Sequence, residues 1–212
     1  ANIMKKIGNH YNKEIRCMLT NMDYPLGSNI GNKIEVMEVL DILQNKKNNL
    51  LKKLVIDMAT EIVSMAKNIT KEEAQKEVIY NLENNLAYNK FLEFLKVQNG
   101  NIDNLKLKKG INIRSEHEGY LTEINALEIG KLSSNLGAGR IKKDDKIDYD
   151  AGIILKKELG DYVKKGDILI SGFIYNKDKI MAKRCSVGQV LGEVWYKVNL
   201  EVPKEYVEEK FT

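Results

Sequence analysis

The alternation of apolar and polar residues predicts a helix, a strand, a loop and a second helix at the start of the chain. Residues 1–14 place Ile3, Met4 and Ile7 on one helical face, before a glycine–asparagine stop. The next stretch, Ile15–Leu19, alternates but has apolar residues on both faces, which is typical of a buried parallel strand. Helix, strand, loop and helix in this order are the rhythm of an α/β sheet.

Further helices are predicted where apolar residues recur at intervals of three and four. One begins at Asn32, a capping residue with a glutamate three positions later. A long amphipathic helix covers residues 50–65. The last helical region opens with a capping box at Thr70, is broken near Asn84–Asn85 or at Asn89, and ends at Val97. We expect the leucine, isoleucine and methionine stripes of these helices to face a core.

The pattern changes near residue 104, where short alternating stretches and turn residues replace long helices. The predicted elements are a strand over 113–125, a short helix over 126–136, two short strands within 151–170, a helix over 176–191 and a strand over 192–201. The sequence therefore predicts the α/β class with two domains. Residues 1–104 would be part of an α/β domain with long helices, and residues 105–212 an α+β domain.

Composition narrows the classes of partner. The 212 residues are 43% hydrophobic, which is ordinary for a globular protein, and carry a formal net charge of +4. Because the lysines are mixed with acidic residues and do not cluster with aromatic residues, we expect no nucleic-acid partner. No run of about 18 apolar residues occurs, so we expect no membrane partner either.

The cysteines and histidines do not suggest a metal site or a catalytic group. Cys17 and Cys185 are far apart, and together with two histidines they form no familiar zinc spacing. Free thiols indicate a reducing, cytoplasmic setting, with Cys17 an inert residue of the buried strand. Histidine is a residue type that serves as a general base, but no nucleophile or paired carboxylate stands beside His10 or His117. A surface or capping role is the simpler interpretation.

The loop Thr20–Leu40 carries the most chemistry. It follows a predicted strand, where α/β folds place ligands, and it is rich in aspartate and asparagine, with Glu38 on the helix that follows. Carbonyl groups and one carboxylate suit a hard cation. The alternative is structural, because aspartate and asparagine also make turns and caps.

Two glycine-containing stretches are weaker candidates for a functional site. Gly137–Arg140, GAGR, has glycines and an arginine that suit an anion, but it also reads as a helix end followed by a turn, with Arg140 paired to Asp144 or Asp145. Residues 160–170 have the turn chemistry of biotinyl and lipoyl carrier domains. No Met-Lys-Met or Asp-Lys-Ala sequence is present, so we expect a carrier-like fold without the carrier function. A carrier domain with a biotinylated or lipoylated lysine is a third and weaker hypothesis.

The sequence TNMDYPLGSNIGNKIEVMEVLDIL, from Thr20 onward, resembles a segment of the pyrimidine-nucleoside phosphorylase and thymidine phosphorylase family. There a Thr-(Asp/Asn)-Met loop precedes Pro-Leu-Gly, Gly-Asn and Glu-Val-x-Glu. FLEFLKVQNGN resembles the family's helix that ends in Gln-Gly-Gly. GYLTEINALEIGKLSSNLGAGR and IDYDAGIILKKELGDYVKKGDILI resemble its C-terminal domain in order and spacing. The resemblance covers about residues 3–198.

This resemblance implies a reaction and a fold. The reaction is the reversible phosphorolysis of a pyrimidine nucleoside to free base and pentose 1-phosphate, catalysed by a pentosyltransferase. Phosphate and pyrimidine nucleoside are then the substrates of the full-length enzyme. The fold adds a carrier-like β module, a barrel-sandwich hybrid, to the C-terminal domain. The family is a homodimer through a small helical domain that this sequence lacks.

The resemblance also implies which site residues are here and which are not. The family's Lys-x-(Ser/Thr)-x-Gly-Gly phosphate loop and its base-binding residues have no counterpart, so we assign no catalytic, phosphate-binding or base-binding residue to this chain. Some members bind a monovalent cation (K+) beside that loop. The matching positions are the backbone carbonyls of Leu26 and Asn29 and the carboxylate of Glu38, although the family often has alanine where Asn29 stands.

Two functions remain open from the sequence. The first is the C-terminal fragment of a pyrimidine-nucleoside phosphorylase that is inactive alone, with base and sugar preference undetermined. The alternative is a non-catalytic binding or assembly module derived from that fold. A fragment would leave a sheet edge and an apolar face exposed, so we expect the chain to self-associate or to be poorly soluble.

Overall fold

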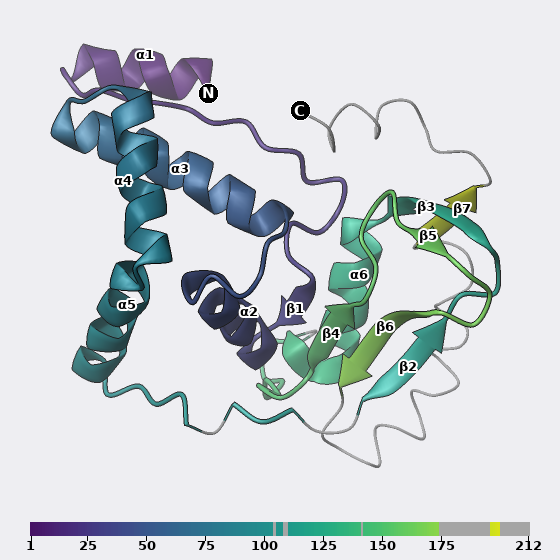
Figure 1. Cartoon of the computed structure of the whole chain (residues 1–212). Helices are drawn as coiled ribbons and strands as arrows, with labels where there is room; N and C mark the ends of the chain where they lie inside the picture. Colours follow the sequence, from purple (N-terminus) through teal and green to yellow (C-terminus); the bar gives the residue numbers. More distant parts are fainter. Residues whose placement is uncertain (104, 108–109, 141, 174–195, 200–212) are drawn as a thin grey trace. The chain divides into compact units, whose positions relative to one another are not determined.

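The computed structural model describes residues 1–103, 105–107, 110–140, 142–173 and 196–199 (Figure 1). The chain divides into two compact units. One contains Ala1–Asn21 and Ile42–Phe94, and the other contains Met22–Asp41 and Leu95–Thr212. In the described residues the first unit contains helices only, and all strands belong to the second. The chain is therefore mixed helix and sheet, as its sequence predicts.

The first unit consists of α1, Asn2–His10; α3, Leu50–Lys67; α4, Lys71–Glu83; and most of α5, Leu86–Val97. The capping box predicted at Thr70 is confirmed: its side chain accepts from the Glu73 N–H, and the Glu73 carboxylate accepts from the Thr70 N–H. Of the two break positions that the sequence left open, Asn84–Asn85 is confirmed, since Asn84 ends α4 and Asn85 has a φ of 57°, whereas Asn89 lies inside α5. Local chemistry is enough to set these boundaries.

The strand predicted at Ile15–Leu19 is wrong. Residues 13–22 form no regular element, and Leu19 is 89% exposed. Cys17, predicted to be buried, is exposed as well. An alternating pattern becomes a strand only when a neighbouring strand pairs with it, and the described residues of the first unit contain none. The prediction that the helical stripes face a core also fails in part, because Met58 and Ile62 of α3 are 45% and 59% exposed.

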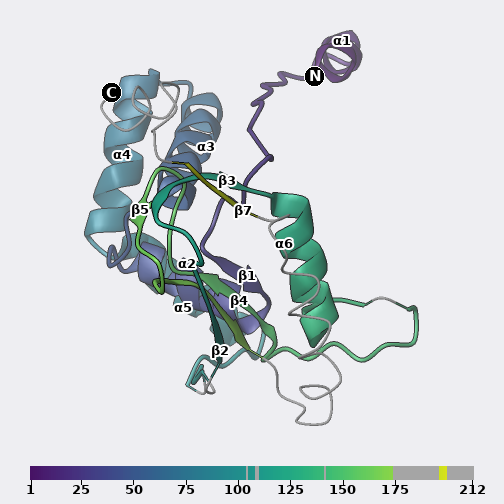
Figure 2. The ribbon, with the colours of Figure 1, turned by 90° about the vertical axis from the view of Figure 1, so that its right-hand side faces the viewer.

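The second unit holds two antiparallel sheets (Figures 1 and 2). One has the order β1-β4-β6-β2 and the other β5-β3-β7, and every pair in the described residues is antiparallel. The strands are β1, Asn29–Gly31; β2, Ile111–Arg114; β3, Gly119–Ile124; β4, Gly152–Leu155; β5, Tyr162–Val163; β6, Ile168–Phe173; and β7, Tyr196–Asn199. The helices are α2, Lys33–Leu43, whose last two residues belong to the first unit, and α6, Ala126–Ser133, followed by a π-helical turn over Ser134–Ala138 in which Gly137 has a non-helical backbone conformation.

The structure of this unit contains more and shorter strands than the sequence pattern predicts. The single strand predicted over 113–125 is two strands, because Ser115 turns the chain: its hydroxyl donates to the His117 carbonyl over 2.7 Å. β2 then joins one sheet and β3 the other. Residues 151–170 contain three strands rather than two. The helix predicted over 126–136 is confirmed, the closing strand is confirmed over β7, and the helix predicted over 176–191 lies outside the described residues.

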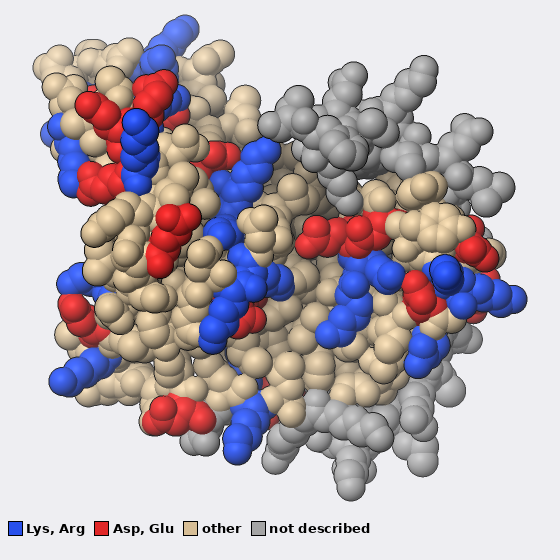
Figure 3. All heavy atoms as spheres, viewed as in Figure 1, with Lys and Arg blue, Asp and Glu red and all other residues tan. Residues whose placement is uncertain are grey.

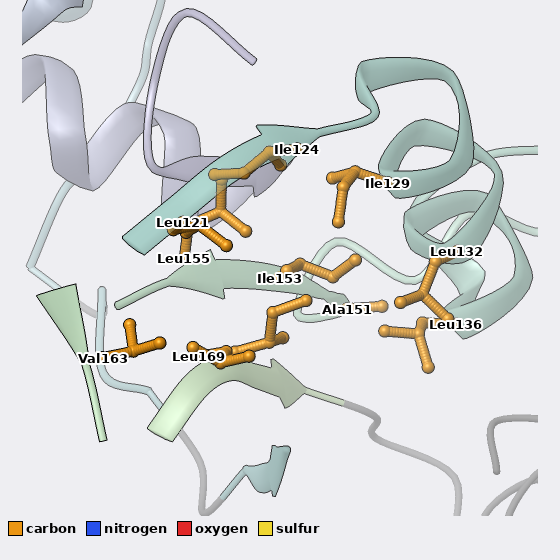
Figure 4. Close-up of a cluster of buried hydrophobic side chains, with 11 residues drawn as sticks. Leu121, Ile124, Ile129, Leu132, Leu136, Ala151, Ile153, Leu155, Val163 and Leu169 are labelled. Carbon is orange, nitrogen blue, oxygen red and sulfur yellow. The ribbon is translucent and has the colours of Figure 1, made fainter. Parts of the chain in front are cut away.

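The core of the second unit lies between the two sheets and α6 (Figure 4). Leu121 from β3, Ile153 from β4 and Ile170 from β6 are at most 2% exposed, and Ile129 from α6 is 1% exposed. Burying such side chains contributes roughly 1.5–3 kcal/mol each. Because α6 also lies beside β1, the same packing supports the β1–α2 segment (Figure 2).

The surface in view carries both signs of charge. Lysine and arginine side chains are interspersed with aspartate and glutamate in Figure 3. In the described part of the chain, no helix is long and apolar enough to span a bilayer.

Candidate functional site

The turn from β1 into α2 is the candidate site, because the predicted ligands Leu26, Asn29 and Glu38 lie in or beside it. β1 is an outer strand of its sheet in the described residues, and α2 begins two positions after β1 ends. The strand lies very close to its neighbour. A Cβ atom on Gly31 would be 2.8 Å from the Ala151 carbonyl oxygen, so only glycine fits there without displacing the backbone.

Glu38 is a buried carboxylate that holds the start of β1. It is 1% exposed, and it accepts hydrogen bonds from the Ser28 N–H at 3.1 Å, the Ser28 hydroxyl at 2.9 Å and the Asn29 N–H at 2.9 Å. A buried charge is costly unless donors replace its water, and these donors do so. The same bonds attach residues 28 and 29 to α2.

The register of β1 also fixes the direction of the Asn29 carbonyl. The Leu155 N–H donates to the Ser28 carbonyl over 2.7 Å, and Asn29 stands opposite Ile154. Hydrogen-bonded and non-bonded pairs alternate in antiparallel sheets, so Asn29 and Ile154 form a non-bonded pair. The N–H and C=O of Asn29 therefore both point away from β4, toward the edge where Glu38 lies.

The structure thus brings two of the three predicted ligands together. The Glu38 carboxylate and the Asn29 carbonyl share one edge, and Leu26 is half-buried in the loop two residues before Ser28. Carboxylate and carbonyl oxygens are the ligands that hard cations prefer. Hydrogen-bond donors already occupy the Glu38 carboxylate, so a cation would share it with them. In the described residues, this edge included, no group of three or more His, Cys, Asp or Glu could hold a metal ion, and the predicted cation site stays a prediction.

Two contributors to this edge were missed by sequence reasoning, namely Ser28 and Glu35. Glu35 Oε1 accepts from the Gly31 N–H over 2.7 Å, so it does for Gly31 what Glu38 does for Asn29. The sequence held a signal for this pairing. Residues 35 and 38 share one helical face, and residues 29 and 31 present their N–H groups to the same side of a strand.

The GAGR stretch is the end of a helix, as its simpler interpretation predicted. Gly137 adopts a φ of 113° within the π-helical turn, and Arg140 is exposed. The Asp145 carboxylate accepts from the Lys142 N–H over 2.8 Å. The Ala138 carbonyl accepts from the Asn32 side chain over 2.8 Å, which links this turn to the candidate site.

Neither histidine belongs to a catalytic arrangement in the described residues. His10 and His117 are both exposed, which confirms the surface interpretation. His10 packs edge-on against the ring of Tyr11, with ring centroids 5.1 Å apart.

A separate concave feature lies within the first unit. It is an open groove of about 790 Å³ lined by α1, residues 15–19 and α3. Among its lining residues Arg16 and Lys71 both pair with Glu61. The hydrogen bond from Lys71, and to a smaller extent the one from Arg16, lowers the pKa of Glu61. Arg16 Nη1 also donates to the Ser64 hydroxyl over 3.2 Å. Arg16 pairs with Glu14 as well as with Glu61, so Arg16, Lys71 and Glu61 are all engaged in ion pairs, and we assign the groove no chemistry.

Comparison with known proteins agrees with the resemblance. Residues 120–187 match the family described as pyrimidine nucleoside phosphorylase C-terminal domain. A thymidine phosphorylase of Metamycoplasma hominis is 38% identical over 177 residues, which are 80% of this chain and 65% of that protein. A pyrimidine-nucleoside phosphorylase of Bacillus subtilis (strain 168) is 36% identical over 193 residues, which are 86% of this chain and 45% of that protein.

A thymidine phosphorylase of Mycoplasmoides pirum is 34% identical over 180 residues, 81% of this chain and 43% of that protein. Over about four fifths of its length, this chain is similar to members of the pyrimidine-nucleoside phosphorylase and thymidine phosphorylase family. It spans 43% to 65% of the length of these three relatives.

Proposed function

We propose that this chain is the C-terminal part of a pyrimidine-nucleoside phosphorylase, which in the complete protein converts a pyrimidine nucleoside and phosphate to free base and pentose 1-phosphate. The observation that carries the proposal is the similarity of about four fifths of the chain to proteins named for this activity. Phosphate and pyrimidine nucleoside as substrates, a homodimeric state, a role in pyrimidine salvage and a cytoplasmic location belong to the same proposal.

We further propose that this chain is inactive alone. The resemblance puts the phosphate loop and the base-binding residues in a part of the family's sequence that has no counterpart here. On this view residues 1–104 complete an α/β domain, and residues 105–212 form the C-terminal domain with its carrier-like module. What this chain would contribute to the site is the β1–α2 edge, with Leu26, Asn29 and Glu38 as one side of a K+ site that supports the phosphate loop.

Phosphorolysis of uridine and of thymidine tests the proposal directly. The isolated chain is assayed, and then the chain is mixed with the part of the Bacillus subtilis relative that lies outside the matched segment. We expect no turnover by the chain alone and measurable turnover by the mixture. The two corresponding parts of the Bacillus subtilis enzyme, mixed in the same way, form the positive control.

The outcomes separate the two functions. Robust turnover by the pure chain contradicts inactivity. Turnover by the control mixture but none by the mixture that contains this chain contradicts the enzymatic proposal and favours a non-catalytic assembly module.

A further inference from the structure

Asn32 stands between β1 and α2, and its side chain does something that its sequence context does not predict. The Asn-x-x-Glu pattern predicts an N-cap whose side-chain oxygen accepts a backbone N–H. In the structure the side-chain nitrogen donates to the Ala138 carbonyl over 2.8 Å, between residues 106 positions apart. The Glu35 carboxylate, the expected capping-box partner, accepts instead from the Gly31 N–H.

The acceptor end of this hydrogen bond is held firmly. Ala138 ends the π-helical turn, directly after Gly137 with its φ of 113°. The Gly137 carbonyl accepts from the Asp148 N–H over 2.9 Å, and Leu136 before it is 4% exposed. Because the turn is fixed by burial and by its own hydrogen bonds, the Ala138 carbonyl is a fixed point to which Asn32 attaches.

The donor end is linked to the candidate ligands. The Asn32 carbonyl accepts from the N–H groups of Glu35 and Val36 at 3.1 and 3.3 Å, so the first turn of α2 is built on Asn32. Glu38 follows on the same helix. A rotation of α2 about its axis would therefore move the Glu38 carboxylate away from the N–H of Asn29, while β1 stays paired with β4.

We propose that Asn32 is a positioning residue of the candidate site. By donating to Ala138 it sets the orientation of α2, and with it the place where the Glu38 carboxylate meets Ser28 and Asn29. Only the consequence of this positioning for catalysis rests on the proposed function. The positioning itself can be tested without any enzymatic turnover.

A donor role and a capping role predict opposite effects of one substitution. Aspartate is as good an N-cap as asparagine, so Asn32→Asp would be neutral for a simple cap. An ionised aspartate has no donor for a carbonyl, and it would place a negative charge against the Ala138 oxygen. Asn125 provides the matched control, because it caps α6 in the ordinary way: its side-chain oxygen accepts from the Glu128 N–H over 3.1 Å.

The experiment measures hydrogen exchange at the Ser28, Asn29 and Gly31 amides, whose N–H groups donate to the carboxylates of Glu38 and Glu35. At pH 7 we expect Asn32→Asp to lower their protection about tenfold, the effect of losing one hydrogen bond, while Asn125→Asp leaves it unchanged. At about pH 4, near the ordinary aspartate pKa of ~3.9, the introduced carboxyl group gains a proton and can donate again. The loss of amide protection in Asn32→Asp, relative to the parent chain at the same pH, should then become smaller.

Unchanged protection in Asn32→Asp at pH 7 overturns the proposal and leaves Asn32 an ordinary cap. An equal loss in Asn125→Asp also overturns it, because the effect would then follow from any asparagine-to-aspartate change in this unit. A failed phosphorolysis assay with normal loss of protection contradicts the proposed function and leaves the positioning role intact.

Discussion

The Asn29 N–H donates to the Glu38 carboxylate over 2.9 Å, so a side chain of α2 satisfies an outward-facing backbone group of β1. An outer strand normally presents unpaired N–H and C=O groups, which invite pairing with other chains. Here Glu38 and Glu35 bind the two outward N–H groups, at Asn29 and Gly31. With these N–H groups bound, this edge of β1 presents mainly carbonyl and carboxylate oxygens, which are the ligands that a cation site would need.

Replacing Glu38 tests how much this edge depends on its carboxylate. In Glu38→Gln one oxygen becomes an NH2 group that faces an N–H or O–H donor, so a hydrogen bond is lost and two donors oppose each other. We expect the free energy of unfolding to fall by about 2 kcal/mol, measured by urea denaturation followed by circular dichroism. Glu93→Gln, at an exposed glutamate paired with Lys90, should change it by less than about 0.5 kcal/mol. Equal effects of the two changes would contradict a special role for Glu38.

A small void beside Gly172 predicts a stabilising substitution. A small apolar pocket of about 20 Å³ lies among β2, β4, β6 and α6, and a Cβ on Gly172 would be 3.5 Å from Leu136 Cδ1, an ordinary van der Waals contact. Gly172→Ala should raise the free energy of unfolding by about 1 kcal/mol, because it fills the void and restricts the unfolded chain. Urea denaturation measures this change.

The matched control for that substitution is Gly152→Ala in the adjacent strand β4. There a Cβ would be 2.5 Å from Ile34 Cδ1 and 2.8 Å from the Ile30 carbonyl oxygen, so the backbones of β1 and β4 would have to separate. We expect a clear loss of stability. If Gly172→Ala destabilises as Gly152→Ala does, the void is not available to a methyl group.

The sequence was sufficient where structure is decided locally. The capping box at Thr70 and the break at Asn84–Asn85 depend on groups a few residues apart, and both were predicted. The strand at Ile15–Leu19 was not predictable in the same way, because pairing needs a partner that the pattern does not supply. The turn at Ser115 was missed because a serine that bonds a nearby carbonyl interrupts alternation without glycine or proline.

For the candidate site, the sequence could predict which residues would be ligands but not what holds them in place. The resemblance gave Leu26, Asn29 and Glu38, and the structure places the last two on one edge. The role of Asn32 could not be predicted, because its partner Ala138 is 106 positions away and nothing local distinguishes a donor from a cap.

The exposed face of α3 bears on the expected self-association. Val55, Met58, Ile62 and Met65 recur at intervals of three and four and are 36% to 59% exposed. We expect light scattering to show a mass that rises with concentration, and Ile62→Lys to reduce that rise by charging the face. Leu127→Lys, at a 66% exposed position of α6, should leave it unchanged. A monodisperse monomer at every concentration would refute the expectation.

The start of α4 should make stability depend on acid pH. The Thr70 N–H, and then its hydroxyl, hydrogen-bond to the Glu73 carboxylate and lower its pKa from the ordinary 4.5. A carboxyl group whose pKa is lower in the folded state stabilises the fold above its unfolded pKa, and this contribution is lost as the pH falls through the folded value. The contribution should therefore be complete above about pH 4.5 and decline below it.

Glu73→Gln isolates this effect, because glutamine still completes a capping box but does not titrate. We expect thermal unfolding to show a larger difference between parent and variant at about pH 6 than at about pH 3. Glu72→Gln removes the same charge from the first turn without touching Thr70, so it measures the general helix-end contribution. If the two variants show the same change with pH, the box contributes nothing beyond that general term.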